Sequence, residues 1–156
     1  MTTEPEDPKS IYQRYLDIVT NAMMDKDFET VLDHLEVPAF ICSHDQQTFV
    51  ESREHMLRIL KSSRQWLDDM KVDTYVRVCR EAEYVSDDHD CIVGEHETFA
   101  MRQGLPIIPA YRSTMAFIPR DGRWLASGIT ANVSDRDFPI TRDDVAIFDK
   151  AAARQC

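Results

Sequence analysis

The sequence lacks several features that would place it in a familiar class of proteins. It carries a formal net charge of −10 and has no basic run, whereas nucleic-acid binding needs a positive surface that displaces counterions. No stretch approaches the roughly 20 apolar residues that a membrane-spanning helix requires. Residues 1–7 are acidic and interrupted by proline, and no apolar run follows them, which is unlike a secretory signal. These absences argue against a nucleic-acid partner and a membrane anchor, and they predict a cytoplasmic protein.

Patterns typical of metal, disulfide and nucleotide sites are absent as well. The four cysteines form no Cys-x-x-Cys pair, and without an export signal we expect them to be reduced thiols: Cys42, Cys79, Cys91 and Cys156. The sequence contains no His-x-x-x-His motif and no glycine-rich phosphate loop. We therefore expect neither a metal ion nor a nucleotide cofactor.

The composition is that of one globular domain. Apolar residues make up 43% of the 156 residues, and only four residues are glycine. A chain of this length can bury a hydrophobic core by itself. We predict a single domain over residues 1–156, with 1–8 and 134–156 as peripheral tails. The second tail is expected to end in a short helix, because Thr141 to Asp144 resembles a capping box.

The strongest secondary-structure pattern lies between Val72 and Val133. Four runs rich in β-branched and aromatic residues are separated by short turns, and they are Asp73–Val85, Asp90–Arg102, Ile107–Pro119 and Gly122–Val133. Connections this short join antiparallel neighbours. The pattern predicts a four-strand antiparallel meander.

Helices and a short hairpin are predicted before the meander. Apolar residues recur at helical spacing over Lys9–Asp25 and again over Arg53–Met70. Asp27 is placed to cap a short helix between them. Ala39–Cys42 and Thr48–Val50 are predicted to pair as a small hairpin. This order of elements is typical of the α+β class.

Short motifs within these elements resemble the nuclear transport factor 2-like superfamily. They are Tyr12-Gln13-Arg14-Tyr15-Leu16, Asp25-Lys26-Asp27-Phe28 and Asp121-Gly122-Arg123-Trp124. The resemblance spans roughly residues 9–134, and the superfamily includes ketosteroid isomerase, the cyclase SnoaL, scytalone dehydratase and the small subunit of ring-hydroxylating dioxygenases. It implies a strongly curved antiparallel sheet that three helices wrap into a cone with an apolar pocket.

The resemblance implies two functions of different classes. The first is a small-molecule-binding domain of the SnoaL-like type, which takes an apolar, aromatic or carbonyl ligand. This first function extends to a cofactor-independent isomerase, dehydratase or cyclase that works by general acid/base catalysis. The alternative is a non-catalytic assembly subunit, like the dioxygenase small subunit. Because one fold hosts many functions, the resemblance does not choose between them.

The turns predict which strand residues share a face. They place Arg80 opposite Glu95, Glu97 opposite Arg112, and Ile118 opposite Arg123. One face is then mainly aliphatic, and we expect the helices to cover it. The other face is aromatic, and we expect it to form a homodimer interface; it carries Tyr75, Cys79, His96, Thr98, Tyr111, Met115, Phe117, Trp124 and Thr130.

Charged residues on the aliphatic face are the first candidates for a site. Glu97 paired with Arg112 is suited to moving a proton beside a carbonyl, with Arg80, Glu95 and Thr114 also lining the pocket. The alternative interpretation is a structural network of salt bridges.

The superfamily resemblance implies further candidates. Ketosteroid isomerase has its general base near the position of His44 and Asp45, and Tyr15 matches a tyrosine on its first helix. The place of its second aspartate falls near Met115, which cannot donate a proton, so the isomerase set is incomplete. His44 and Asp45 are equally compatible with a polar turn. Trp66 is expected either to line the pocket or to belong to the core.

Overall fold

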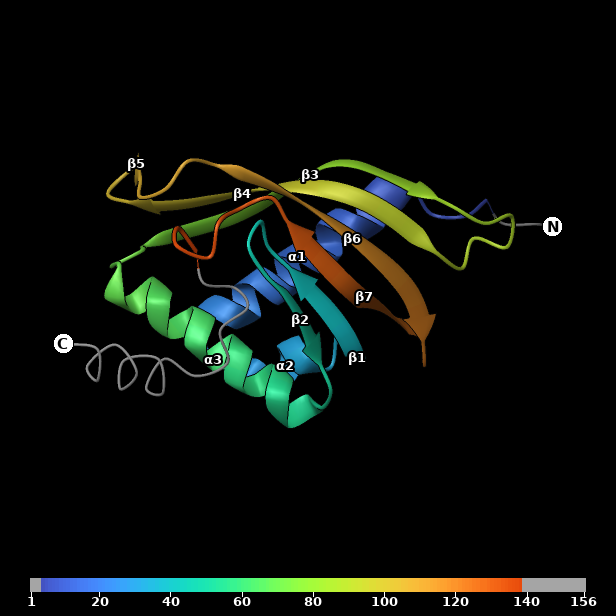
Figure 1. Cartoon of the computed structure of the whole chain (residues 1–156). Coiled ribbons are helices and arrows are strands. Elements are labelled where there is room, and N and C mark those ends of the chain that lie inside the picture. The colour runs from blue at the N-terminus through green and yellow to red at the C-terminus, as the bar shows by residue number, and fades with distance from the viewer. Residues whose placement is uncertain (1–3, 139–156) are drawn as a thin grey trace.

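A computed structural model of the chain describes residues 4–138 and shows an α+β fold (Figure 1). Within these residues, three helices lie on one side of a seven-stranded sheet. The helix predicted after Thr141 and the predicted thiol of Cys156 lie outside the described residues.

Each helix begins where a side chain caps its first turn. Helix α1 spans Pro8–Met24, α2 spans Phe28–Leu32 and α3 spans Arg53–Asp69. The capping oxygens accept hydrogen bonds from backbone N–H groups in the first turns, and they belong to Asp7, Asp27 and Ser52. The three predicted helices are confirmed, although the middle one ends earlier than expected because the next strand begins close behind it.

The strands form a mixed sheet rather than an antiparallel one. They are β1 (Leu35–Cys42), β2 (Gln47–Val50), β3 (Thr74–Tyr84), β4 (Ile92–Arg102), β5 (Leu105–Pro106), β6 (Tyr111–Arg120) and β7 (Arg123–Ala131). The order across the sheet is β2-β1-β7-β6-β4-β3, with β5 pairing beside β4. The hairpin β1–β2 and the meander β3-β4-β6-β7 are confirmed as antiparallel. The all-antiparallel prediction is wrong at one place, because β1 runs parallel to β7. These two strands are far apart in sequence, so no short turn constrains their relative direction.

Two-residue turns fix the register of two hairpins. Gln103-Gly104 and Asp121-Gly122 all have positive φ angles, as a type I′ turn requires. The turn at Gln103-Gly104 pairs Arg102 with Leu105. The register then shifts by two residues between β5 and β6, and Glu97 lies opposite Arg112, which confirms that predicted pair. The turn at Asp121-Gly122 sets Ile118 opposite Leu125 rather than Arg123, because the loop is shorter than we assumed.

Two bulges change the predicted faces. Cys79 lies opposite His96 and Glu81 lies opposite Glu95, so Arg80 is an extra residue and the predicted Arg80–Glu95 pair is wrong. A second register shift lies in β7 near Ser127. The side chains after it point to the opposite faces from those that simple alternation predicts.

The helices cover the face that we expected to be a dimer interface. On this inner face lie Cys79, His96, Thr98, Tyr111, Met115 and Phe117, all buried within one copy of the chain. The opposite, outer face carries the charged candidates. The prediction chose the wrong side because it ranked aliphatic content above charge, although four ionised side chains are far more costly to bury than aromatic rings.

Helix α1 packs closely on the inner face. A Cβ at Gly94 would lie 2.5 Å from both the Tyr12 ring and the Glu81 carbonyl oxygen, so only glycine lets the helix approach β4 this closely. At the other end of the sheet, Phe138 is buried against Trp66, Tyr75 and Tyr111. Phe138 is therefore part of the core, whereas Arg136 and Asp137 before it are exposed.

Candidate functional site

The space between the helices and the inner face holds a cavity of about 130 Å³, which we call the inner cavity. Apolar side chains from α1, α3, β7 and the segment after it make most of its wall, including Val19, Met23, Ile59, Leu67, Ile129 and Phe138. In volume it is comparable to cavities that take one benzene-sized molecule.

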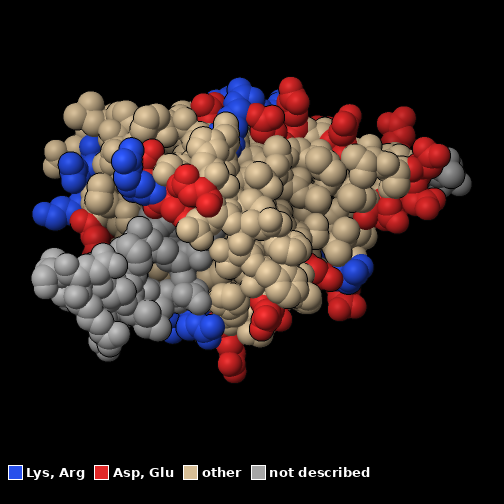
Figure 2. All heavy atoms as spheres, viewed as in Figure 1, with Lys and Arg blue, Asp and Glu red and all other residues tan. Residues whose placement is uncertain are grey.

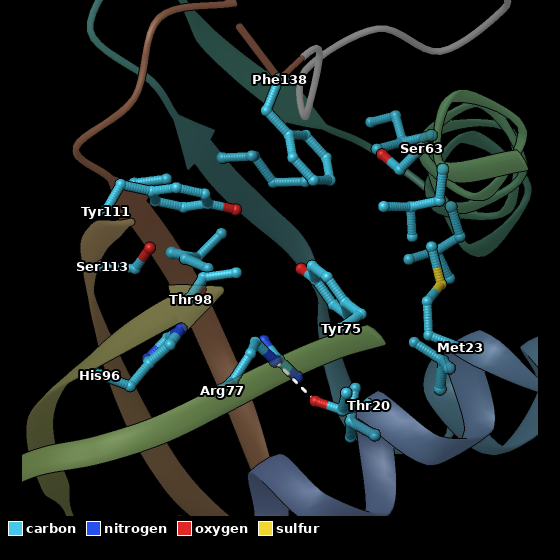
Figure 3. A pocket seen from close by; sticks show the side chains of 18 residues that line it. Thr20, Met23, Ser63, Tyr75, Arg77, His96, Thr98, Tyr111, Ser113 and Phe138 are labelled. Carbon is cyan, nitrogen blue, oxygen red and sulfur yellow. Dashed lines mark hydrogen bonds between the residues drawn. The ribbon is translucent and has the colours of Figure 1, made fainter. Parts of the chain in front are cut away.

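Polar groups gather on the sheet side of this cavity (Figure 3). They come from alternate residues of three neighbouring strands, which is why they share one face. Thr98 lies between Arg77 and Tyr111 in one row of the sheet, and His96 lies beside Ser113 in the next. The hydroxyl ends of Tyr75 and Tyr111 point toward the middle of the space. We call Tyr75, Arg77, His96, Thr98, Tyr111 and Ser113 the polar corner.

His96 is fully buried and hydrogen-bonded on one side of its ring. The Tyr12 hydroxyl lies 2.7 Å from its Nδ1, and burial raises the pKa of that phenol, so the hydroxyl keeps its proton and donates it. We assign the tautomer from this hydrogen bond, which leaves the hydrogen on Nε2. Burial, together with the nearby charge of Arg77, lowers the pKa of His96 to about 3. The ring is therefore neutral and presents an N–H.

Two polar atoms of the corner lack a partner. Neither Nε2 of His96 nor Oγ of Ser113 has a hydrogen-bond partner among the described residues, and both atoms are buried. Buried polar groups are nearly always hydrogen-bonded, and leaving one unpaired costs about 1–3 kcal/mol. An unpaired N–H and hydroxyl side by side on a cavity wall are what a ligand oxygen would meet.

Arg77 brings a positive charge into the same corner. Its Nε donates to Oγ1 of Thr20 on α1 at 2.8 Å, which holds the guanidinium against the cavity (Figure 3). Within residues 4–138 no carboxylate forms a salt bridge with it, and no acidic residue lines the inner cavity. The inner cavity therefore has one fixed cation and several neutral donors.

Comparisons with known proteins extend this picture to the fold. No protein-family model and no curated protein matches the chain by sequence. Among solved structures, a protein of unknown function from Shewanella oneidensis, described as NTF-2 like, aligns with a TM-score of 0.63 and 12% identity, over 81% of this chain and 99% of that one. The chain has the nuclear transport factor 2-like fold.

Other proteins of this nuclear transport factor 2-like fold differ from one another in description. Aln2 from a Streptomyces species aligns with a TM-score of 0.62 and 9% identity, over 86% of this chain and 96% of that one. A hexachlorocyclohexane dehydrochlorinase, LinA-type3 from Novosphingobium barchaimii, aligns with a TM-score of 0.56 and 13% identity, over 79% of this chain and 84% of that one. Identities this low speak for a shared fold and leave function to the site itself.

A second cavity of about 130 Å³ adjoins the first. Arg77 contributes to the walls of both, as do Val19, Leu60 and Ile129. Glu36 lines the second cavity, and its Oε1 lies 3.6 Å from Nη2 of Arg120. Tyr15 lines it too, and its hydroxyl donates to the His34 carbonyl at 2.6 Å. Burial raises the pKa of Tyr15, so this sequence-predicted residue stays protonated and is already hydrogen-bonded.

The predicted charged pocket residues lie together, but on the outer face. Arg112 Nη1 is 2.9 Å from Glu95 Oε1, and Arg80 Nη2 is 2.7 Å from Glu97 Oε1. Thr114 is exposed on the same side. None of the five lines either cavity. The structure therefore brings together the network that the alternative interpretation described, at the water-exposed surface.

The other sequence-predicted residues hold loops and core in place. Asp45 is exposed and accepts hydrogen bonds from Ser134 Oγ and from the backbone N–H of Asp135, which lowers the pKa of its carboxyl. His44 contacts Asn132 through its ring. These contacts tie the β1–β2 turn to the segment after β7. Trp66 stacks on Phe138 from outside the inner cavity, with ring centroids 4.6 Å apart.

None of the six residues of the polar corner was a site residue predicted from the sequence. Four of them were expected at a dimer interface, and Arg77 and Ser113 were not assigned at all. The alternation of side chains along the strand could have indicated Arg77, because it lies two residues from Tyr75 and from Cys79, which are on the aromatic face. A cation in the middle of such a face is unusual. The part of the chain that the structure describes contains no group of three or more potential metal ligands, and none of its helices is long and apolar enough to span a membrane.

Proposed function

We propose that the protein binds a small, largely apolar molecule in the inner cavity. The observation that carries this proposal is the pair of buried, unpartnered polar atoms, His96 Nε2 and Ser113 Oγ, in a wall that is otherwise mostly apolar. Ligand pockets typically combine an apolar lining with a few convergent polar groups. The three helices lie on the side of the sheet that holds this cavity (Figure 1), and residues of all three line it.

The chemistry of the cavity favours binding over proton transfer. General acid/base catalysis works best with a group whose pKa lies near the working pH. In the inner cavity the histidine has a pKa of about 3, and burial raises the pKa of Tyr111 well above its ordinary value. Glu97 and Asp45, the predicted bases, lie outside the cavity. We therefore propose a ligand-binding domain, and place isomerase, dehydratase or cyclase activity second.

A cavity-filling variant tests the proposal. Ser63 of α3 is buried and lines the inner cavity, so Ser63→Leu would place an apolar side chain in the ligand's space. A thermal-shift screen of small aromatic, carbonyl and carboxylic compounds should find ligands of the parent protein that this variant no longer binds. Lys61→Leu, which adds the same side chain to the exposed side of α3, should bind like the parent. Loss of binding in neither variant would place the ligand elsewhere.

A second candidate role, assembly, is favoured by the outer face. Phe40 and Phe49 stack there with ring centroids 5.0 Å apart and are 48% and 46% exposed, and Val76 and Val93 are exposed on the same side. A groove of about 270 Å³ runs beside them. We propose that a second copy of this chain covers this face, because exposed apolar side chains lie there beside groups of both signs that a second copy can match.

Light scattering after size exclusion tests the homodimer. The parent should have twice the mass of one chain at micromolar concentration. Phe40→Ser with Val93→Asp should have the mass of one chain and keep its helical circular dichroism. A parent that already runs as a monomer contradicts the assembly role and leaves the ligand-binding proposal intact.

A further inference from the structure

Arg77 is the most unusual group of the inner cavity, because a charge there has no opposite partner. The single hydrogen bond of its side chain among the described residues, to Thr20, goes to a neutral hydroxyl. Glu36 lines the second cavity and not the inner one, and it lies beside Arg120. Arg77 is half-buried, so its charge loses part of its hydration, and an opposite charge would compensate that loss. The missing partner is expected to be an anion.

The neighbours of Arg77 all add donors on the same side. Thr98 is its direct partner across β3 and β4, and the next row holds His96 beside Ser113. The tautomer fixed by Tyr12 makes Nε2 of His96 a donor, and the Ser113 hydroxyl is unpaired. An acceptor with more than one oxygen satisfies a guanidinium, an N–H and a hydroxyl together.

The rest of the cavity limits what else the anion can carry. Its apolar walls and its volume of about 130 Å³ match one six-membered ring. One cation compensates one negative charge, and the surrounding protein has a net charge of −10. Acidic side chains are spread over the visible surface in Figure 2. A dianion such as phosphate would therefore meet one matching charge inside a negatively charged protein, whereas a monoanion is balanced.

Resting on the proposed function, we infer that the ligand is a small monocarboxylic acid with a ring-sized apolar body, and that its carboxylate pairs with Arg77. A guanidinium matches a carboxylate in shape and forms two parallel hydrogen bonds with it. Arg77 is a specificity-determining residue in this arrangement. It distinguishes the acid from neutral molecules of the same shape, which the apolar wall accepts equally well.

Paired ligands and paired variants test the inference. Binding of phenylacetate and of its neutral isostere phenylacetamide is measured by calorimetry on the full chain. Phenylacetate should bind the parent at least about 10-fold more tightly than the amide, since hydrogen bonds to charged groups contribute about 1.5–3 kcal/mol. Arg77→Gln should remove that preference and leave amide binding within about threefold. Arg80→Gln, three residues along β3 on the outer face, is the control and should keep the preference.

The outcomes separate this inference from the proposal on which it rests. If the amide binds as well as the acid and Arg77→Gln changes neither, the cavity binds ligands but the charge selectivity is wrong. If neither compound nor benzoate and cyclohexanecarboxylate bind, the proposed function itself fails. If inorganic phosphate binds with the same dependence on Arg77 and the acids do not, the site is an inorganic anion site and the inference is overturned.

The stability of the unliganded protein gives an independent readout. If Arg77 serves to bind a ligand, its unpaired charge lowers the stability of the folded protein when no ligand is bound. Arg77→Met should therefore raise the melting temperature of the free protein or leave it unchanged. The parent should recover the difference when phenylacetate is added, and the variant should not respond. A clear fall in the melting temperature of unliganded Arg77→Met would show that Arg77 has a structural role, and would overturn the inference.

Discussion

The arginine side chains on the two faces of the sheet differ in their partners and in their exposure to water. On the outer face, Arg80 and Arg112 lie 2.7 and 2.9 Å from a glutamate oxygen and are partly exposed to water. On the inner face, Arg77 of the same strand as Arg80 has no carboxylate partner within residues 4–138 and faces a mostly apolar cavity. Paired charges in water cost little and contribute little, whereas a half-buried charge without an opposite partner loses hydration that nothing replaces. The difference supports the proposal that the inner arginine pairs with a ligand and the outer pairs are structural.

The bulge at Arg80 determines the faces of the β3 residues that follow it. Before it, Tyr75, Arg77 and Cys79 alternate onto the inner face, as period-2 geometry requires. The extra residue keeps Arg80 on the outside together with Glu81 and returns Ala82 to the core side. Without the bulge, the β3 side chains on either side of Arg80 would not share their present faces. Arg77 and Arg80 point to opposite sides of the sheet by alternation alone, and the local irregularity places Glu81, rather than Ala82, on the outer face.

The largest expected effect comes from truncating a core side chain on the inner face. Phe117 is fully buried and packs edge-on against Tyr12 and Tyr15. Phe117→Ala should lower the free energy of unfolding by about 3–5 kcal/mol, measured by urea denaturation. Val93→Ala on the outer face is the comparison and should cost less than about 1 kcal/mol. If Phe117→Ala instead left stability unchanged and only weakened self-association, the assignment of the faces would be wrong.

A smaller effect is expected from the pH dependence of His96. Its folded pKa is about 3 and its unfolded value about 6.5, so below pH 6.5 the unfolded chain binds a proton that the folded chain does not. The stability is fully present above pH 6.5 and is lost as the pH falls toward 3. Between pH 7.5 and 4.5 the loss should be about 2–3 kcal/mol. The same pH series on His96→Gln gives the part of the stability loss that comes from protonation of carboxylates. Equal losses in both proteins would contradict a buried neutral histidine.

The elements of the fold were largely predictable because their signals are local. The side chain of Asp27 caps the helix that it was expected to cap, and the meander follows from period-2 runs between turns. The pairing of Glu97 with Arg112 followed from a single loop. The parallel contact of β1 with β7 was not predictable, since no local signal connects strands that far apart.

The site was predicted less well for a different physical reason. Register groups residues into faces, but it does not say which face the helices cover. Tyr75, His96 and Tyr111 were grouped correctly on one face, which was then wrongly expected to be a dimer interface. Charge was the better guide, because four ionised groups stay near water while aromatic rings and a neutral histidine can be buried. Arg77 does not follow this rule, because it is a charged residue on the inner face. The proposed site depends on that residue.

The smallest expected effect sharpens the comparison from the outer side. Were Arg112 buried with Glu97, its loss would cost about 3–5 kcal/mol by leaving a carboxylate unpaired. In the structure Arg112 is half exposed and pairs with Glu95, whose side chain is 30% exposed. Water can therefore solvate Glu95 once the arginine is gone, and Arg112→Ala should lower the free energy of unfolding by less than about 1 kcal/mol. The loss of stability should be smaller still in 1 M salt, because exposed charges are then screened from one another beyond a distance of about 3 Å. A loss of several kcal/mol that salt does not alter would mean that the outer face is covered in the folded protein, as it would be in a homodimer.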